Sequence, residues 1–375
     1  MRRLLISVCC FTVIVFTSAP PAWGADADNL FQVAIPVVSQ ASAERAKAAS
    51  LGLRKVLIRM SGSSDAIDTD TVHQAYSQAQ NYIEQFHYEP FVPHSTTRVE
   101  DRDATELLVM TFSRSVIERL LREADKPYWP PNRPGVLVWL VTDSATQGKV
   151  LVNDRDNAVV SGLLEGARDR GLQIRLPLLD LEDRLALPAG QLWQLEEGAI
   201  LAASERYDAD TLLVGRFSRT SRGQWLSTWQ FFHRGENREF DVRSDSGVEL
   251  GIDAMNPLAD HLANLYAISP SEHGTPDLVV QLTDIENFGQ YRQALDYLRG
   301  LALVSDLELR AVRGDTLLLY VQTGGGLDML RNAFALDGKL RPAPTVATDV
   351  EAEMPPWLRV QEGTPENPVS FVWQG

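Results

Sequence analysis

The stretch VLVWLV at residues 136–141 decides the fold of the central part of this chain. A strand with one solvated face alternates apolar and polar residues, whereas a strand covered on both faces reads as a nearly continuous apolar run. This run is of the second kind. We therefore expect residues 136–141 to form a buried strand in a sheet that helices cover.

The residues that follow this strand alternate between strand and helix patterns as far as residue 268. Further strands are expected at residues 172–179, 211–217 and 225–232, and helices at residues 157–170, 190–207 and 248–266. The strands at 211–217 and 225–232 should pair antiparallel through the polar turn between them. Alternating strands and helices with one late hairpin predict a mixed α/β sheet covered by helices.

Two stretches rich in turn-forming residues divide the chain. KPYWPPNRPG at 126–135 has too many prolines for a helix or a central strand, and SPSEHGTP at 269–276 has the composition of a linker. We expect a signal peptide at 1–24, an N-terminal α/β domain at 25–125, a linker at 126–135, a middle α/β domain at 136–268, a C-terminal domain at 277–341 and a loosely ordered tail at 342–375. Three aromatic residues of the tail could dock on the folded body: Trp357, Phe371 and Trp373.

The two outer segments carry their own strand and helix patterns. In the first segment we expect strands at 30–38 and 106–112 and helices at 41–60, 71–85 and 115–123, with Ser42 as an N-cap. In the last segment we expect strands at 278–282, 307–312 and 316–321 and helices at 288–300 and 327–336. This βαββα order is close to a split βαβ sandwich. The fold class is therefore predicted to be α/β (α+β), as two or three small mixed-sheet domains with covering helices.

The first 24 residues have the order of a secretory signal peptide. Arg2 and Arg3 precede a short apolar run, and small residues before the bond between Gly24 and Ala25 suit cleavage there. The apolar run is shorter than the roughly 20 residues that a membrane-spanning helix needs. We therefore expect a periplasmic protein that keeps no stable membrane span after cleavage.

Export and cleavage would limit the chemistry open to the mature chain. Both cysteines, Cys9 and Cys10, lie in the signal segment, so the mature chain would have no disulfide, thiolate zinc site or cysteine nucleophile. Without Arg2 and Arg3, 33 basic residues face 50 acidic ones, a formal charge of −17 that disfavours nucleic acid and anionic lipid. The histidines lack the short paired spacing of a zinc site, so we expect neither a metal nor a cofactor.

Three sets of side chains carry the candidate chemistry. The aromatic residues of the strand at 225–232, namely Trp225, Trp229 and Phe231, share one face, which is either a binding platform or a surface packed under a helix; we favour packing. Clustered carboxylates could serve a hydrolase or be solvated: Asp180, Glu182 and Asp183, and Asp154 and Asp156. The run NDRDN at 153–157 could hold calcium but lacks the glycine and distal glutamate of an EF-hand loop, and a solvated turn is favoured.

Several motifs resemble those of an uncharacterised family of proteobacterial exported proteins, domain of unknown function twenty sixty-six (DUF2066). They include LRKVLIRMSG at 53–62, Tyr128-Trp129, Arg133-Pro134, LPLLD at 176–180 and ERYDADTLLVG at 205–215. These motifs are structural in character, and the resemblance implies no activity. The middle segment is also similar to small α/β domains of periplasmic assembly proteins, such as the outer-membrane activators of peptidoglycan synthases.

Export, several modest domains and the lack of a coherent catalytic set lead to one functional hypothesis. We expect a non-enzymatic periplasmic accessory or scaffold protein of the bacterial cell envelope, which acts through contacts with an envelope protein partner. The alternatives are a periplasmic hydrolase of glycan or peptide that uses the clustered carboxylates, and a protein that binds a small ligand or calcium. An apolar, exposed groove would favour a protein partner, whereas a polar groove lined by acids would favour catalysis.

Overall fold

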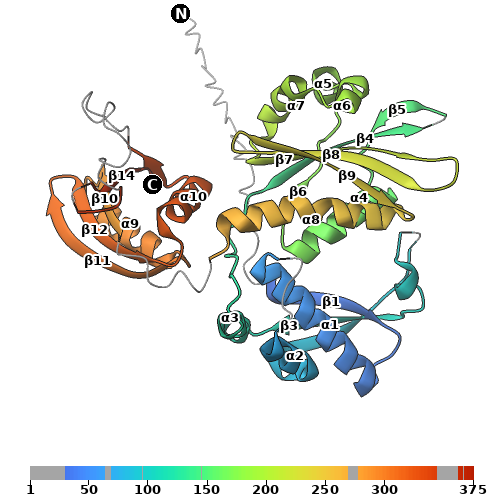
Figure 1. Cartoon of the computed structure of the whole chain (residues 1–375), viewed down its shortest axis with the longest axis horizontal. Helices are drawn as coiled ribbons and strands as arrows, with labels where there is room; N and C mark the ends of the chain where they lie inside the picture. Colours follow the sequence, from blue (N-terminus) through green and yellow to red (C-terminus); the bar gives the residue numbers. More distant parts are fainter. Residues whose placement is uncertain are drawn as a thin grey trace, which may run out of the picture.

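The chain is a mixed α/β protein, as the sequence predicted. The computed structural model describes residues 30–63, 69–94, 96–144, 146–268, 278–343, 362–365 and 367–375. The expected signal peptide, the bond between Gly24 and Ala25, and Trp357 lie outside these residues. Within them, three sheets form an N-terminal, a middle and a C-terminal part, which Figure 1 shows side by side.

The N-terminal part is a three-stranded antiparallel sheet with helices packed on it. Its elements are β1 (Gln32–Val37), α1 (Ser42–Ser61), α2 (Asp70–Ser77), β2 (Ile83–Pro90), β3 (Glu106–Phe112) and α3 (Arg114–Glu123). The central strand β3 and the helix α1 bury Met110, Leu53 and Leu57 against each other in one apolar cluster. Residues 83–85, expected as the end of a helix, instead begin β2, and Ser42 lies inside α1 because Ala41 is the N-cap.

The middle part is a six-stranded mixed sheet with helices on both faces. Its strands are β4 (Val136–Ser144), β5 (Gly148–Leu151), β6 (Ile174–Arg175), β7 (Thr211–Arg219), β8 (Trp225–His233) and β9 (Glu236–Ser244). As predicted, residues 136–141 are buried throughout, and β7 and β8 pair antiparallel. Strand β4 pairs parallel with β7, and the order β5-β4-β7-β8-β9 places β4 inside the sheet.

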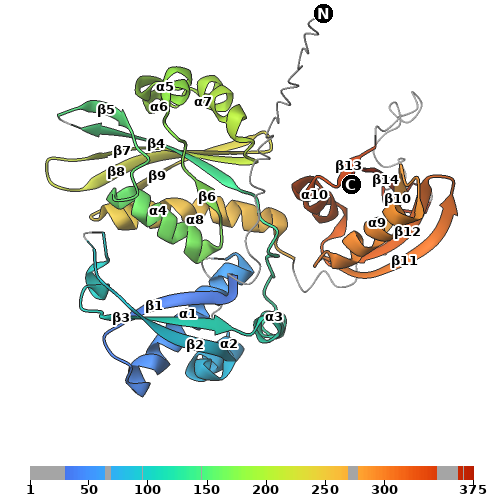
Figure 2. The same cartoon turned by 180° about the vertical axis from the view of Figure 1, so that it is seen from behind.

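Two layers of helices enclose this sheet. α4 (Ala158–Arg170) and α8 (Gly247–Tyr266) lie on the face toward the N-terminal part, and α5 (Leu181–Ala186), α6 (Ala189–Gln194) and α7 (Glu197–Ser204) lie on the other (Figures 1 and 2). The single helix expected at 190–207 is broken because Leu195 adopts a left-handed conformation with φ 56°. The strand expected at 172–179 is reduced to the two residues of β6.

α4 and α8 touch through glycines. Gly162 and Gly166 in α4, like Gly247 and Gly251 in α8, are four residues apart and so lie on one side of their helix. A Cβ built at Gly162 would come within 1.9 Å of the carbonyl oxygen of Val248, and one at Gly251 within 2.2 Å of a carbonyl oxygen in α4. The two backbones therefore meet without side chains between them.

The C-terminal part is a five-stranded sheet in the order β11-β12-β10-β14-β13. Its elements are β10 (Leu278–Thr283), α9 (Phe288–Gly300), β11 (Val304–Arg313), β12 (Thr316–Thr323), α10 (Gly326–Asp337), β13 (Leu340–Pro342) and β14 (Val369–Trp373). The expectation of a loosely ordered tail is wrong for β14, which lies between β10 and β13. Every second residue of β14 faces the core and is buried, namely Val369, Phe371 and Trp373. This alternation is typical of a strand, although the tail before it is rich in proline.

Two buried arginines, Arg133 and Arg170, join the N-terminal part to the middle part through hydrogen bonds. Arg133 in the linker donates to the carbonyl oxygens of Arg59 in α1 (2.9 Å) and of Arg170 (2.8 Å) and Gly171 at the end of α4. Arg170 donates to the carbonyl oxygen of Gly62 at 2.8 Å. Burial, together with the nearby guanidinium of Arg59, lowers the pKa of Arg133 to about 9. The Arg-Pro and LRKVLIRMSG motifs thus serve the contact between these two parts.

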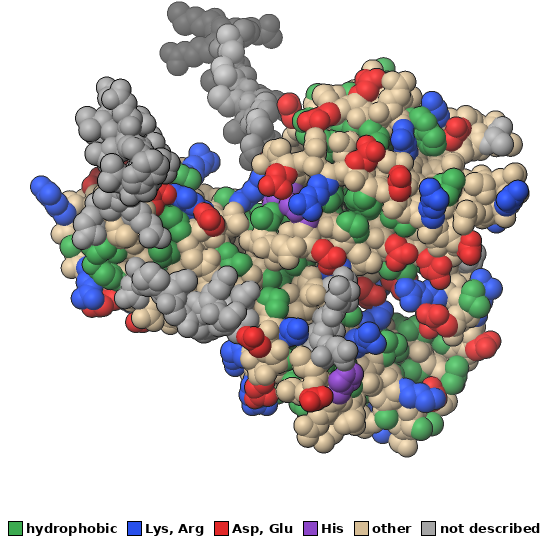
Figure 3. Space-filling view, viewed as in Figure 1, with side chains coloured by type: hydrophobic (Ala, Val, Ile, Leu, Met, Phe, Trp, Pro, Cys, Tyr) green, Lys and Arg blue, Asp and Glu red, His purple; other side chains and the backbone are tan. Residues whose placement is uncertain are grey.

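The surface of the middle part mixes charges of both signs. On the face shown in Figure 3, acidic and basic side chains are interspersed, which is the distribution expected of solvated charge. Among the described residues, no helix has both the length and the apolar character needed to cross a bilayer.

Candidate functional site at the junction of the three parts

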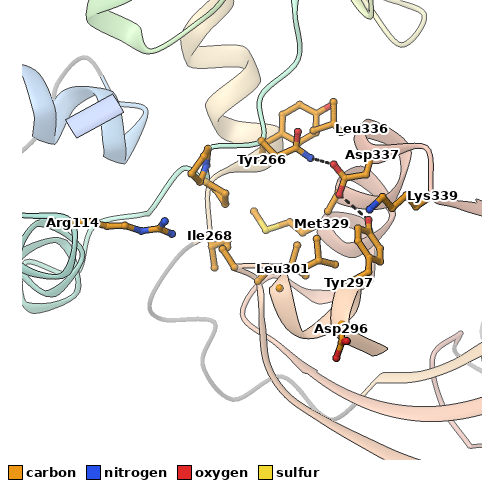
Figure 4. A pocket seen from close by; sticks show the side chains of 17 residues that line it. Arg114, Tyr266, Ile268, Asp296, Tyr297, Leu301, Met329, Leu336, Asp337 and Lys339 are labelled. Carbon is orange, nitrogen blue, oxygen red and sulfur yellow. Dashed lines mark hydrogen bonds between the residues drawn. The ribbon is translucent and has the colours of Figure 1, made fainter. Parts of the chain in front are cut away.

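A cavity of about 520 Å³ opens where the three parts of the chain meet. Its walls come from α3, the proline-rich linker, the end of α8, the end of α9 and α10 (Figure 4). Most lining side chains are apolar or aromatic: Pro130, Pro131, Tyr266, Ile268, Tyr297, Leu301, Ala302, Leu303, Met329, Ala333 and Leu336. The polar ones are Arg114, Asn132, Asp296, Asp337 and Lys339. This volume and lining, at an interface between domains, are typical of ligand-binding sites.

One end of the cavity is polar and centres on Asp337. One carboxylate oxygen accepts a hydrogen bond from the amide of Asn132, and the other accepts one from the hydroxyl of Tyr297 at 2.8 Å. Lys339 places its ammonium 5.1 Å from the centre of the Tyr297 ring. Burial, together with the charge of Asp337, raises the pKa of Tyr297. Tyr297 is therefore a neutral hydrogen-bond donor at physiological pH.

The other walls differ in character from this end. Ile268, Leu301 and Met329 lie between the polar end and Arg114, whose guanidinium group extends toward Ile268 from the opposite side (Figure 4). Arg114 forms an ion pair through Nε with Glu118 at 2.8 Å. The carboxylate of Asp296 points away from Asp337 and its hydrogen-bond partners (Figure 4). The cavity thus has an apolar middle, with Arg114 at one end and Asp337 and Lys339 at the other.

Tyr266 contributes its ring to the cavity wall while its hydroxyl is held from within the middle part. The hydroxyl lies 2.8 Å from Nε2 of His233, and Nδ1 of His233 lies 2.8 Å from the hydroxyl of Thr211. Burial lowers the pKa of His233 to about 4, with a further contribution from Arg234, and burial raises the pKa of Tyr266 to about 12. Both groups are neutral at pH 7, so this chain of hydrogen bonds fixes the orientation of the Tyr266 ring.

The carboxylates considered for a hydrolase are engaged in structure. Asp180 caps α5 by accepting from the amide of Asp183, and Arg206 pairs with Asp180 (3.0 Å), with the fully buried Asp183 (2.9 Å) and with Glu182. Asp183 also accepts from the hydroxyl of Tyr207. The hydrogen bond from Arg206 lowers the pKa of Asp180. These acids fasten α5 to the residues after α7, and they do not line the junction cavity.

The aromatic residues of β8 pack in the core beneath α4 and α8. Trp229 and Phe231 are 0% and 1% exposed, so their interpretation as a binding platform is wrong, and the alternative of packing under a helix describes them. Trp225 is partly buried against the same cluster, with its ring 6.1 Å from that of Phe217. Gly215 on β7 leaves the room that the Trp229 ring occupies, because a Cβ there would lie 2.2 Å from it.

The NDRDN run forms the turn that starts α4. Asn157 is the N-cap and accepts from the amide of Val159 at 2.9 Å, while Asp154 accepts from the amide of Asp156 at 3.0 Å. Asn153 donates to the carbonyl oxygen of Pro177. Within the described residues, no three His, Cys, Asp or Glu side chains are grouped as potential metal ligands.

The residues that line the cavity were not found from the sequence. They come from segments far apart in the chain, and none forms a motif whose spacing is local. The prolines at 126–135 predict only a linker between domains, whereas Pro130, Pro131 and Asn132 form one wall of the cavity. Tyr266, Tyr297 and Met329 lie within amphipathic helices, a pattern that core packing also produces.

Comparison with protein families matches residues 25–130 to a model described as Domain of unknown function (DUF8605). This is a different family from DUF2066, so the resemblance drawn from the sequence motifs was assigned to the wrong family. The matched residues include the N-terminal part and the first prolines of the linker, but none of the middle or C-terminal sheet.

No match was found among the curated proteins. Among solved structures, the chain is similar to one titled "Crystal structure of uncharacterized protein", with 12% identity over 36% of this chain and 91% of that chain. The TM-score is 0.16, and a likeness at this level carries no argument about fold or function.

Proposed function

We propose that this protein is a non-enzymatic accessory protein of the bacterial cell envelope, exported to the periplasm, and that it binds a partner protein at the junction cavity. One observation carries the proposal: a cavity of about 520 Å³ with a mainly apolar lining opens where the three parts meet. An apolar groove open to solvent favours a protein partner over catalysis.

The composition of the lining supports the same choice. Tyrosine, methionine and arginine are enriched in protein interfaces, and all three occur here as Tyr266, Tyr297, Met329 and Arg114. Asp337 is held by two hydrogen bonds from the protein itself, which suits a group that positions a partner.

Site-specific photo-crosslinking in living cells tests this function. A photoreactive residue at Ala302, on the rim of the cavity, should give one discrete adduct with an envelope protein, whereas the same residue at the exposed Val92 should not. Ala333→Phe fills the cavity and should abolish the adduct. Ala335→Phe, on the exposed side of the same helix α10, is the matched control and should preserve it.

Cell fractionation tests the location. The mature chain should be recovered from the periplasm with Ala25 as its first residue. Recovery of the intact chain from the cytosol, or an adduct that both phenylalanine variants leave unchanged, would refute the proposal.

A further inference from the structure

We propose that the junction cavity takes an extended, uncharged peptide segment, which inserts one large apolar side chain between α9 and α10. This inference rests on the proposed function and names the chemistry of the partner. It follows from the apolar middle of the cavity, from its polar end and from the balance of charge along it.

The middle of the cavity suits an apolar anchor. Ile268, Leu301 and Met329 surround it (Figure 4). Ala333 of α10 also lines the cavity, and its small side chain leaves space there. Methionine adapts its shape to different apolar partners because its side chain is unbranched and polarisable. Interfaces that bind through one buried anchor place it in a desolvated pocket of this kind. A leucine or phenylalanine side chain is therefore the expected occupant.

The polar end distinguishes a peptide from a hydrocarbon chain. Asp337 and Lys339 border the cavity, and a hydrocarbon that filled it would remove water from both without replacing their hydrogen bonds. Each carboxylate oxygen of Asp337 accepts one hydrogen bond from the protein and has a further lone pair to offer. A peptide carries an amide donor and a carbonyl acceptor at each residue, so it can satisfy both groups.

The charges along the cavity favour an uncharged segment. Arg114 at one end is paired with Glu118, and Lys339 at the other end lies beside Asp337. Each end therefore holds one positive and one negative group, and the remaining acid of the lining, Asp296, points away from Asp337, so neither end favours a ligand of one sign. A charged side chain that entered the apolar middle would lose its hydration and meet no opposite charge there.

Methyl NMR on residues 25–375 tests the inference with defined probes. Residues 25–375 contain five methionines, and Met329→Leu assigns the signal of Met329. The peptide probe is acetyl-Leu-Phe-Leu-amide, and the hydrocarbon probe is decyl maltoside. The peptide should shift the Met329 methyl signal to saturation, whereas decyl maltoside below its micelle concentration should not.

Three variants complete the design. Ala333→Phe should lower the affinity for the peptide by a factor of about ten or more, and a factor of ten corresponds to about 1.4 kcal/mol of binding free energy. Ala335→Phe should leave the titration unchanged. Lys339→Met removes a hydrogen-bond donor at an exposed position and leaves no cavity in the core. It should lower the affinity for the peptide and raise the affinity for decyl maltoside.

The outcomes separate this inference from the proposed function. Saturation by decyl maltoside alone would assign the cavity to a hydrocarbon chain and overturn the inference. A cellular adduct at Ala302 with no response to the peptide would leave the function standing and show that the partner docks as a folded surface. Peptide binding without any cellular adduct would support the recognition chemistry and refute the function.

Discussion

Replacement of Gly162 by alanine should destabilise the middle part through a clash between two helix backbones. The added methyl carbon would lie 1.9 Å from the carbonyl oxygen of Val248, 2.7 Å from its carbonyl carbon and 2.9 Å from its Cα. A carbon and a carbonyl oxygen approach to about 3.3 Å, so α4 and α8 must separate by roughly 1.4 Å at this point. No side-chain rotation can relieve the contact, because all three atoms belong to the backbone of α8.

The magnitude follows from two opposing effects. Overpacking of a well-packed core costs about 1 to 3 kcal/mol, and a backbone obstacle places Gly162→Ala near the upper end of that range. Alanine is favoured over glycine inside a helix by about 0.5 to 1 kcal/mol. We therefore expect the free energy of unfolding to fall by about 2 kcal/mol.

Urea unfolding of residues 25–375, followed by tryptophan fluorescence, measures this change. Trp139 and Trp229 are buried in the middle part and report on it. Gly198→Ala is the matched control, since Gly198 is an exposed glycine inside α7 and a Cβ there meets nothing within 4 Å. Gly198→Ala should raise the free energy of unfolding by up to about 1 kcal/mol. If Gly162→Ala unfolds at the same urea concentration as Gly198→Ala, the account of the α4–α8 contact is wrong.

Three further predictions concern buried polar groups. Arg133→Met leaves five carbonyl oxygens without this donor and should lower the free energy of unfolding by about 3 to 5 kcal/mol in urea titrations. Asp183→Ala leaves the amide of Leu179 and the hydroxyl of Tyr207 without their acceptor and should lower the free energy of unfolding by about 1 to 3 kcal/mol in the same measurement. The folded pKa of His233, about 4, lies below its ordinary 6.5, so the unfolded chain binds a proton first and stability should fall as the pH drops from 6.5 to about 4. His233→Gln should flatten this fall, which amounts to at most about 3 kcal/mol; an unchanged pH profile would contradict the assignment.

Local patterns were enough for most of the fold. The apolar run at 136–141, the Asn157 cap and Gly171 at the end of α4 each specify an element through residues next to one another. β9 was missed because its sequence, ENREFDVRS, is charged, as suits the exposed edge of a sheet. β14 was missed because its pairing depends on β10, nearly ninety residues earlier.

The candidate site could not be predicted in the same way. The carboxylates at 180–183 and the aromatic residues of β8 are close together in the sequence, which suggests a site, yet Arg206 pairs with the carboxylates and α8 packs on the aromatic residues. Asp337 and Asn132 are 205 residues apart and meet only because the C-terminal part docks against the linker. The glycines of α4 and α8 did offer a signal, since their four-residue spacing in both helices indicates a close helix contact.

Helix α8 of the middle part also contacts the N-terminal and C-terminal parts. Gly251 meets α4, Tyr266 faces the junction cavity, and Ala263 lies so near Gly62 of the N-terminal part that a Cβ built on that glycine would be 2.4 Å from its own. Residues 25–130, the segment with a family match, are therefore not a portable module in this protein. A protein that contained these residues without α8 would need another helix in its place. Otherwise the C-terminal end of α1 would be exposed to solvent.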